Sequence, residues 1–300
     1  QKRFVLKPIR HPNLWNIFFK LYCRVSNFIF SQEDLFDLIS NNESTIYPEF
    51  FFKGTKIINS QSVEIPSEGV LQFMIQHRFG TLNSGFYNLF GLDNSQVRIG
   101  FDYGLNKWLS IGLGRSSSLK AIDSNLKFRL ARQCSGSVNF PFTLVFNTSV
   151  ALKQFRFSEI NKPNFIFLDN LSFTNQLLIA RKLNRKFSFQ LTPSLLHYNL
   201  LPINQTFHDQ FSIGYGGRYK LNNRLSVNFE SFYQLNSDNN INQLSFGLDI
   251  ETGGHVFQLH VTNSPYMIDR AFIHETYDSW FEGDIYFGFN ISRVFTLQEK

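Results

Sequence analysis

Charged and polar side chains recur at every second position along several segments of this 300-residue chain. The alternation places acids, bases and one imidazole on a single face of each segment. If these faces share one interior, opposite charges can pair there, or together line a water-filled path for a small polar solute. The residues concerned are Arg98, Asp102, Lys127, Arg129, Arg218, Glu230, Asp249, Glu251 and His260.

Hydrolytic chemistry is the first alternative use of the polar residues, with Ser194, His197 and His208 as candidates. A nucleophile needs a base within hydrogen-bond reach. Ser194 and His197 share a predicted strand but fall on opposite faces of it. The sequence also has no G-x-S-x-G elbow. We therefore predict no catalysis, and keep a membrane-embedded lipid hydrolase as an alternative.

The histidines are the natural candidates for a metal site, because imidazole is a common metal ligand. His255 and His260 lie near each other in sequence, whereas His77 and His274 are distant. This spacing matches no compact metal motif, such as two histidines four residues apart on a helix. We predict neither a metal ion nor a cofactor.

Strands must position these side chains. Between residues 96 and 105, Val97, Ile99, Phe101 and Tyr103 alternate with polar residues and glycine. The same period of two recurs from residue 69 to residue 295. It predicts about twelve strands with one apolar and one polar face, as in a membrane barrel.

The connections between the predicted strands alternate in length. Those after odd strands are longer, such as 80–94 and 263–283, whereas those after even strands include 106–107 and 222–223. Bacterial barrels have an even strand number, short periplasmic turns and long external loops. The lengths therefore predict that both ends of the barrel domain lie on the periplasmic side and that the long loops point outward.

Composition supports a lipid-facing wall. The chain contains 36 Phe, and charged residues make up 17%, against about 25% in a typical soluble domain. No run approaches the roughly 18 apolar residues of a membrane helix. A soluble β-sandwich is the alternative, but the many Phe on one face would then meet water. The prediction is an all-β fold, a closed antiparallel transmembrane β-barrel of about 12 strands.

The net charge of +6 is spread over connections and polar faces. A nucleic-acid site would gather its basic residues in one patch, so we predict no nucleic-acid partner.

The chain divides into three predicted parts. Residues 1–31 look like an anomalous or damaged targeting segment, basic at first and then aromatic and aliphatic, with an amphipathic periplasmic helix as the alternative. Residues 32–68 are a periplasmic lead, a plug inside the barrel, or an extra strand around 56–65. Residues 69–300 form the barrel.

The predicted last strand, 284–295, resembles the C-terminal signal that barrel-assembly machinery recognises, through Phe287, Phe289 and Phe295. The expected partners are that machinery and outer-membrane lipid. Four runs resemble an uncharacterised β-barrel family of Bacteroidota outer membranes, a domain of unknown function: 75–80, 98–104, 251–260 and 287–295. The resemblance covers residues 32–297. It implies a location in the outer membrane of such an organism and no assigned activity.

The expected function is passive passage of small solutes, or a structural or accessory role in the outer membrane. A side-chain network that fills the lumen and a small open pore both fit an interior of about twelve strands. A surface-loop binding module is the other alternative, with the loop 263–283 as its binding element.

Overall fold

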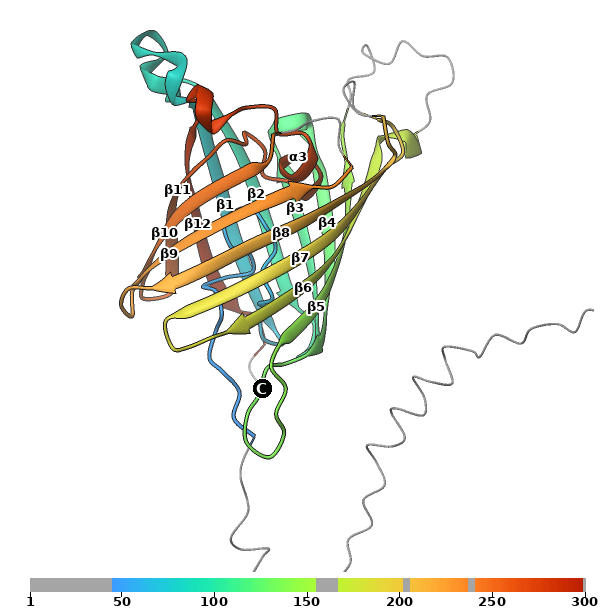
Figure 1. Ribbon diagram of the computed structural model, residues 1–300, viewed down its shortest axis with the longest axis vertical. Coiled ribbons are helices and arrows are strands. Elements are labelled where there is room, and N and C mark those ends of the chain that lie inside the picture. Colours follow the sequence, from blue (N-terminus) through green and yellow to red (C-terminus); the bar gives the residue numbers. More distant parts are fainter. Residues whose placement is uncertain (1–44, 155–166, 202–205, 237–240, 299–300) are drawn as a thin grey trace, which may run out of the picture. The chain divides into compact units, whose positions relative to one another are not determined.

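Twelve strands of the described residues form one closed antiparallel barrel, in which each strand pairs with its neighbours in sequence and the last closes on the first (Figure 1). The computed structural model describes residues 45–154, 167–201, 206–236 and 241–298. The closed antiparallel barrel confirms the predicted fold class. The strands are β1 Val70–Thr81, β2 Ser95–Gly104, β3 Leu109–Ser116, β4 Ile122–Ala131, β5 Thr143–Leu152, β6 Leu171–Lys182, β7 Phe187–Tyr198, β8 Asp209–Lys220, β9 Leu225–Gln234, β10 Gln243–Thr252, β11 His255–Thr262 and β12 Tyr286–Thr296.

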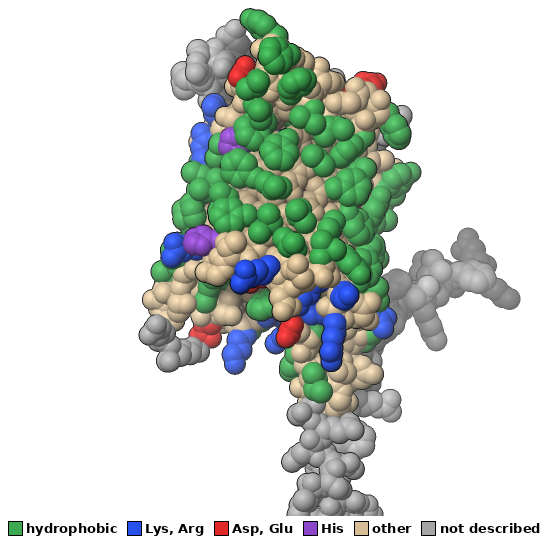
Figure 2. Space-filling model, turned by 90° about the vertical axis from the view of Figure 1, so that its left-hand side faces the viewer, with side chains coloured by type: hydrophobic (Ala, Val, Ile, Leu, Met, Phe, Trp, Pro, Cys, Tyr) green, Lys and Arg blue, Asp and Glu red, His purple; other side chains and the backbone are tan. Residues whose placement is uncertain are grey.

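The two faces of the wall differ as the alternation predicts. In β2, Ile99 and Phe101 are more than 40% exposed on the outside, whereas Arg98, which precedes Ile99, is buried inside. Apolar side chains cover the outer wall in a broad band, with charged residues below it (Figure 2). Closure also pairs the edge strands β1 and β12, so no sheet edge faces the lipid.

Asparagine side chains make the tight turns between strands. Asn222 Oδ1 accepts hydrogen bonds from the backbone N–H groups of Arg224 and Leu225, both at 2.8 Å. Asn184 does the same for Lys186 and Phe187, also at 2.8 Å. An Asn side chain that mimics a backbone turn explains why these connections are so short. We call this end of the barrel the short-turn end and the opposite end the long-loop end.

The helices of the described residues are all short and lie in the long-loop connections. Among them, α3, Asp269–His274, is an α-helix between β11 and β12. The 3-10 helices are η1 Leu82–Ser84, η2 Phe86–Gly91, η3 Ser118–Lys120, η5 Phe167–Asn170 and η6 Trp280–Glu282. Within the described ranges, none of the helices has the length and apolar character to cross a bilayer.

The chain before β1 enters the barrel. Residues 51–65, which we call the inner segment, are almost entirely buried. Six of its apolar side chains pack against Val145, Leu178 and Ala180 of the wall. Within the described part of residues 32–68, the inner segment lies inside the barrel, as the plug alternative expects, whereas Ile46, Tyr47 and Phe50 before it are exposed. Only an isolated bridge, Lys56 to Gln61, occurs where the extra strand was considered. Residues 1–31 lie outside the described ranges.

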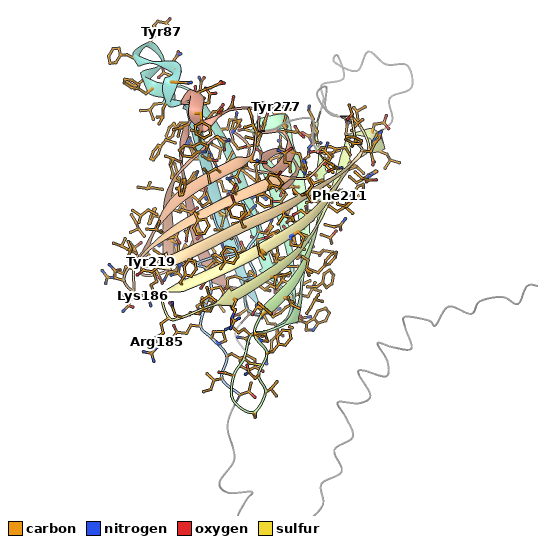
Figure 3. All side chains as sticks on the ribbon, in the orientation of Figure 1. Tyr87, Arg185, Lys186, Phe211, Tyr219 and Tyr277 are labelled. Carbon is orange, nitrogen blue, oxygen red and sulfur yellow. The ribbon has the colours of Figure 1, made fainter. Side chains whose placement is uncertain are left out.

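The loop between β11 and β12 differs from the prediction. We expected residues 263–283 to point outward, but the part that forms α3 folds inward, since every residue of α3 is buried in the mouth of the barrel, whereas Phe281 near the end of the loop is fully exposed. Both polar and apolar contacts hold the helix there. Asp269 faces the inner segment, and Phe272 packs on Phe232 of β9 at 5.5 Å between ring centroids. The connection that projects instead is η1–η2, with Tyr87 at its tip (Figure 3).

Candidate functional site

The candidate site is the middle of the lumen, where the inner segment turns back on itself. Ile57 N donates to Ser60 O at 2.9 Å, and Ser62 N donates to Thr55 O at 2.9 Å. These bonds make a small hairpin whose tip, residues 57–60, points into the barrel. The tip brings backbone N–H groups into an interior lined by polar wall residues.

Glu230 of β9 binds the tip. Its carboxylate accepts hydrogen bonds from the backbone N–H groups of Ile58 at 3.1 Å, Asn59 at 2.9 Å and Ser60 at 3.0 Å. It also accepts from the Ser60 hydroxyl at 2.6 Å. Hydrogen bonds to an ionised group are about twice as strong as neutral ones. The turn thus forms an anion-binding nest that the wall fills with its own carboxylate.

Two basic residues of the wall bind further acceptors of the inner segment. Lys127 Nζ donates to the carbonyls of Thr55 at 2.7 Å, Ser62 at 3.0 Å and Glu64 at 3.4 Å. Arg78 Nη2 donates to Asn59 Oδ1 at 2.7 Å. Both side chains are fully buried, so these contacts offset part of the cost of removing their charges from water.

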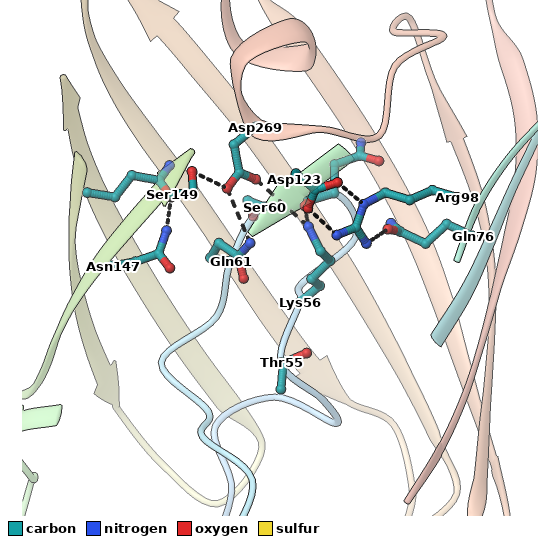
Figure 4. A network of polar contacts seen from close by, with 12 residues as sticks. Thr55, Lys56, Ser60, Gln61, Gln76, Arg98, Asp123, Asn147, Ser149 and Asp269 are labelled. Atoms are coloured by element: carbon teal, nitrogen blue, oxygen red, sulfur yellow. Dashed lines mark hydrogen bonds and ion pairs between the residues drawn. The ribbon is translucent and has the colours of Figure 1, made fainter. Parts of the chain in front are cut away.

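Asp269 of α3 links the inner segment to the long-loop end. Gln61 Nε2 donates to Asp269 Oδ2 at 3.2 Å, and Lys56 Nζ lies 3.8 Å from Asp269 Oδ1 (Figure 4). Ser149 of β5 lies at 3.5 Å from the same carboxylate. A segment that enters from the short-turn end and a loop that enters from the long-loop end therefore meet in mid-lumen.

A second cluster beside this contact is built on Arg98 of β2. Arg98 Nε donates to Asp123 Oδ1 at 3.0 Å, Nη2 donates to Asp123 Oδ2, and Nη1 donates to Gln76 Oε1 at 2.9 Å. The guanidinium lies over Gly114 of β3, where an added Cβ would fall 2.1 Å from Nη2. The inward glycine is thus required by the volume of the arginine beside it.

Burial shifts the pKa values of groups on the two inserted elements. It lowers the pKa of Lys56, which Asp269 partly counteracts. It raises the pKa of Glu64, although hydrogen bonds from the Phe51 and Phe52 N–H groups oppose this change. In α3, burial lowers the pKa of His274 to about 3. Docking of each element therefore depends on pH.

The structure places the nine predicted lumen residues as follows. Arg98, Lys127, Arg218, Glu230, Asp249 and His260 are buried in the interior. Asp102 accepts from Thr55 Oγ1 at 2.6 Å. Arg129 and Glu251 lie at the short-turn end, where Arg129 donates to Lys107 O at 2.8 Å and Glu251 pairs with Lys53. His260 makes no hydrogen bond to the described residues.

Sequence reasoning missed Arg78, Lys56, Gln61 and Asp269. Arg78 could have been predicted, because in β1 it lies on the same alternating face as Gln72 and Gln76. The other three gave no signal, since they lie outside the strands and no period of two assigns them to a face.

The hydrolase candidates do not assemble. Ser194 is buried in the lumen, whereas His197 is exposed and pairs with Asp209, Nδ1 to Oδ1 at 2.6 Å. The rings of His197 and His208 stack at 6.2 Å. This histidine pair has an orienting carboxylate, but Ser194 lies on the other side of the wall. Among the described residues, no three His, Cys, Asp or Glu side chains gather as a metal site.

The predicted assembly residues lie on the outer wall where the barrel closes. The ring of Phe289 stacks on His77 at 4.8 Å, and that of Phe287 on Phe79 at 5.9 Å. Phe295 lies under the guanidinium of Arg293 at 4.9 Å. Their recognition by assembly machinery stays a prediction.

The chain is similar in fold to several solved barrels. The NanC porin aligns with a TM-score of 0.47 at 7% identity, over 75% of this chain and 98% of that one. The KdgM porin aligns with 0.46 at 8% identity, over 75% and 99%. The COG4313 outer membrane channel from Pseudomonas putida F1 aligns with 0.45 at 12% identity, over 77% and 97%.

A search of curated protein sequences found no match. A family model described as "Membrane bound beta barrel domain (DUF5777)" matches residues 52–295, a range that covers all but the first residue of the inner segment and all but the last residue of the twelve strands. The chain therefore belongs to this family of membrane-bound β-barrels.

Proposed function

We propose that this membrane-bound barrel lies in a bacterial outer membrane and gives small polar solutes a narrow passive route that its own inner segment restricts. Single-chain barrels with short turns at one end and long loops at the other are typical of that membrane. The observation that carries the proposal is that a separate stretch of chain, and not the wall, fills the middle of the lumen. A wall can stay intact while such an insert moves.

The contacts at the tip of the inner segment suit movement. Glu230 and Arg78 hold residues 58–60 through hydrogen bonds, and Lys127 binds the carbonyls of Thr55, Ser62 and Glu64 on either side of the tip. Folding or docking exchanges such bonds with those to water, so each contributes only about 0.5–3 kcal/mol net. The tip can therefore separate from the wall while the hydrogen bonds between the strands of the barrel stay intact.

Solute uptake by proteoliposomes tests the proposal. Vesicles that contain the purified barrel should take up a small neutral solute such as arabinose faster than protein-free vesicles, and should exclude a trisaccharide such as raffinose. Uptake no faster than that of protein-free vesicles would support the structural or accessory role instead.

Binding at the cell surface is a second candidate, favoured by the projecting connection at residues 82–92. Phe86 is 80% exposed and Tyr87 is 94% exposed. Exposed aromatic patches often mark interaction sites. Nitration of Tyr87 tests this candidate: a partner on intact cells should protect the ring relative to the purified barrel, and equal nitration would argue against a partner.

We propose no catalytic step, because the His197–Asp209 pair lies on the outer wall and Ser194 inside. A Bacteroidota origin and removal of a targeting segment within residues 1–31 are also proposals, supported by the four similar sequence runs and the early basic residues. We propose outer-membrane lipid and the barrel-assembly machinery as partners. Density fractionation of the membranes of such a host tests the location.

A further inference from the structure

A cavity of about 450 Å³ opens at the short-turn end, between the inner segment and the ends of the strands. Seven of its lining residues are Lys or Arg and three are Glu, an excess of four positive charges. Ligand pockets commonly measure about 300–1,000 Å³. We call this cavity the basic vestibule; its basic residues are Lys53, Lys182, Arg185, Lys186, Arg218, Lys220 and Arg293.

Three of the basic side chains contact the inner segment, hold it on the wall, or bind the residues directly before it. Lys53 pairs with Glu251, Lys182 donates to the carbonyls of residues 49 and 50 at 3.4 and 3.3 Å, and Arg218 donates to the carbonyl of residue 51 at 3.2 Å. These contacts explain why positive charge is present, but not why it is in excess.

Lys186 and Lys220 are not used in this way. Lys186 directly precedes β7 and Lys220 ends β8, and the backbone N–H of Lys220 donates to the carbonyl of Lys186 at 2.8 Å. Neither ammonium group forms an ion pair or hydrogen bond with the described residues. Like charges placed opposite each other on adjacent strands repel. Arg185, on the same turn as Lys186, adds a third positive charge (Figure 3).

A buried neutral donor lines the same cavity. Gln72 of β1 is 5% exposed, and its Nε2 has no hydrogen-bond partner in the described structure. A buried donor without an acceptor costs about 1–3 kcal/mol. An anion in the vestibule would supply an acceptor for this amide and offset the excess positive charge of the lining.

We infer that the basic vestibule binds a small organic anion that carries carboxylate or phosphate groups. The site faces the short-turn compartment and is lined by inward side chains, so a free solute fits it better than the headgroup of a lipid, whose acyl chains must remain outside the wall. Binding does not require passage, and this inference therefore stands or falls separately from the proposed function.

Citrate is a suitable probe, titrated calorimetrically into the purified full chain in a non-ionic detergent at low salt. The test variant is Lys186→Gln/Lys220→Gln. The control, Arg181→Gln/Arg224→Gln, removes the same charge at the same end, from exposed side chains that do not line the vestibule. We expect citrate to bind wild type and control alike, and the test variant to bind about tenfold more weakly, as loss of charge-assisted contacts implies.

Heat-modifiable migration in gels shows whether each variant is folded, and these exposed positions should leave it unchanged. An equal loss of affinity in both double variants would overturn the inference, because the effect would then be one of net charge. Absence of saturable citrate binding would overturn it as well. If the wild type instead retained phosphatidylglycerol through Lys186 and Lys220 and ignored citrate, the site would be one for lipid headgroups.

Discussion

Replacement of Glu230 by Gln should free the tip of the inner segment and leave the barrel folded. The carboxylate accepts three backbone N–H bonds and one hydroxyl bond from residues 58–60. The amide of Gln has the same shape but only one acceptor oxygen, and its NH2 group would face donors. Removing one partner of a buried charged network typically costs about 3–5 kcal/mol.

The apolar packing of the inner segment decides how far the effect spreads. Four buried apolar side chains outside the tip, among them Phe52 and Val63, join the cluster with the wall. At about 1.5–3 kcal/mol each, they contribute about 6–12 kcal/mol as an upper bound. This exceeds the loss at Glu230. We therefore expect local release of residues 57–60 and not expulsion of the whole segment.

Amide hydrogen exchange is the direct assay. In Glu230→Gln the amides of Ile58, Asn59 and Ser60 should exchange at least a hundredfold faster than in wild type, which corresponds to about 3 kcal/mol. Glu251→Gln is the matched control, since Glu251 also contacts the inner segment, through Lys53, but is 40% exposed, and exposed pairs contribute about 0–1 kcal/mol. Unchanged exchange in Glu230→Gln, or the same increase in the control, would refute the reasoning.

Three further predictions concern the other contacts of the lumen. Lys127→Met removes the donor to three carbonyls and should destabilise docking of the inner segment by about 3 kcal/mol. The amide of residue 64 should then exchange faster, whereas unchanged exchange would show that the lysine is dispensable. Asp269→Asn weakens the contact with Lys56 and should make α3 more sensitive to protease, with no effect if the helix docks by apolar packing alone. His274 has its pKa lowered by burial to about 3, so docking of α3 is fully stable above pH 6.5 and should lose about 3 kcal/mol by pH 4; protease cleavage of the 263–283 loop should rise over that range in wild type and stay flat in His274→Gln.

Strand alternation made the wall predictable. The last strand was expected at 284–295 and lies at Tyr286–Thr296, because each residue there either faces lipid or faces the interior, and a slip by one would reverse every side chain. The parity of connection lengths likewise identified the short-turn end.

The contents of the lumen could not be read in the same way. The tip of the inner segment docks on Glu230, 170 residues further along the chain from Ser60, and no local period signals a contact at that separation. α3 has only six residues and no side-chain cap, so neither a helical stripe nor a start signal marks it. The loop that contains α3 was expected outside because connection length predicts the side of the membrane and not the direction of folding.

Single-channel conductance in a planar bilayer tests the central claim most directly, that the chain's own inner segment closes the barrel. Wild type should show a small conductance, and the folded Glu230→Gln/Lys127→Met variant should show larger or longer openings, because the segment that fills the lumen has lost its charged contacts. Equal conductance in the two proteins, with faster exchange at residues 58–60 proving that the tip is free, would contradict the claim.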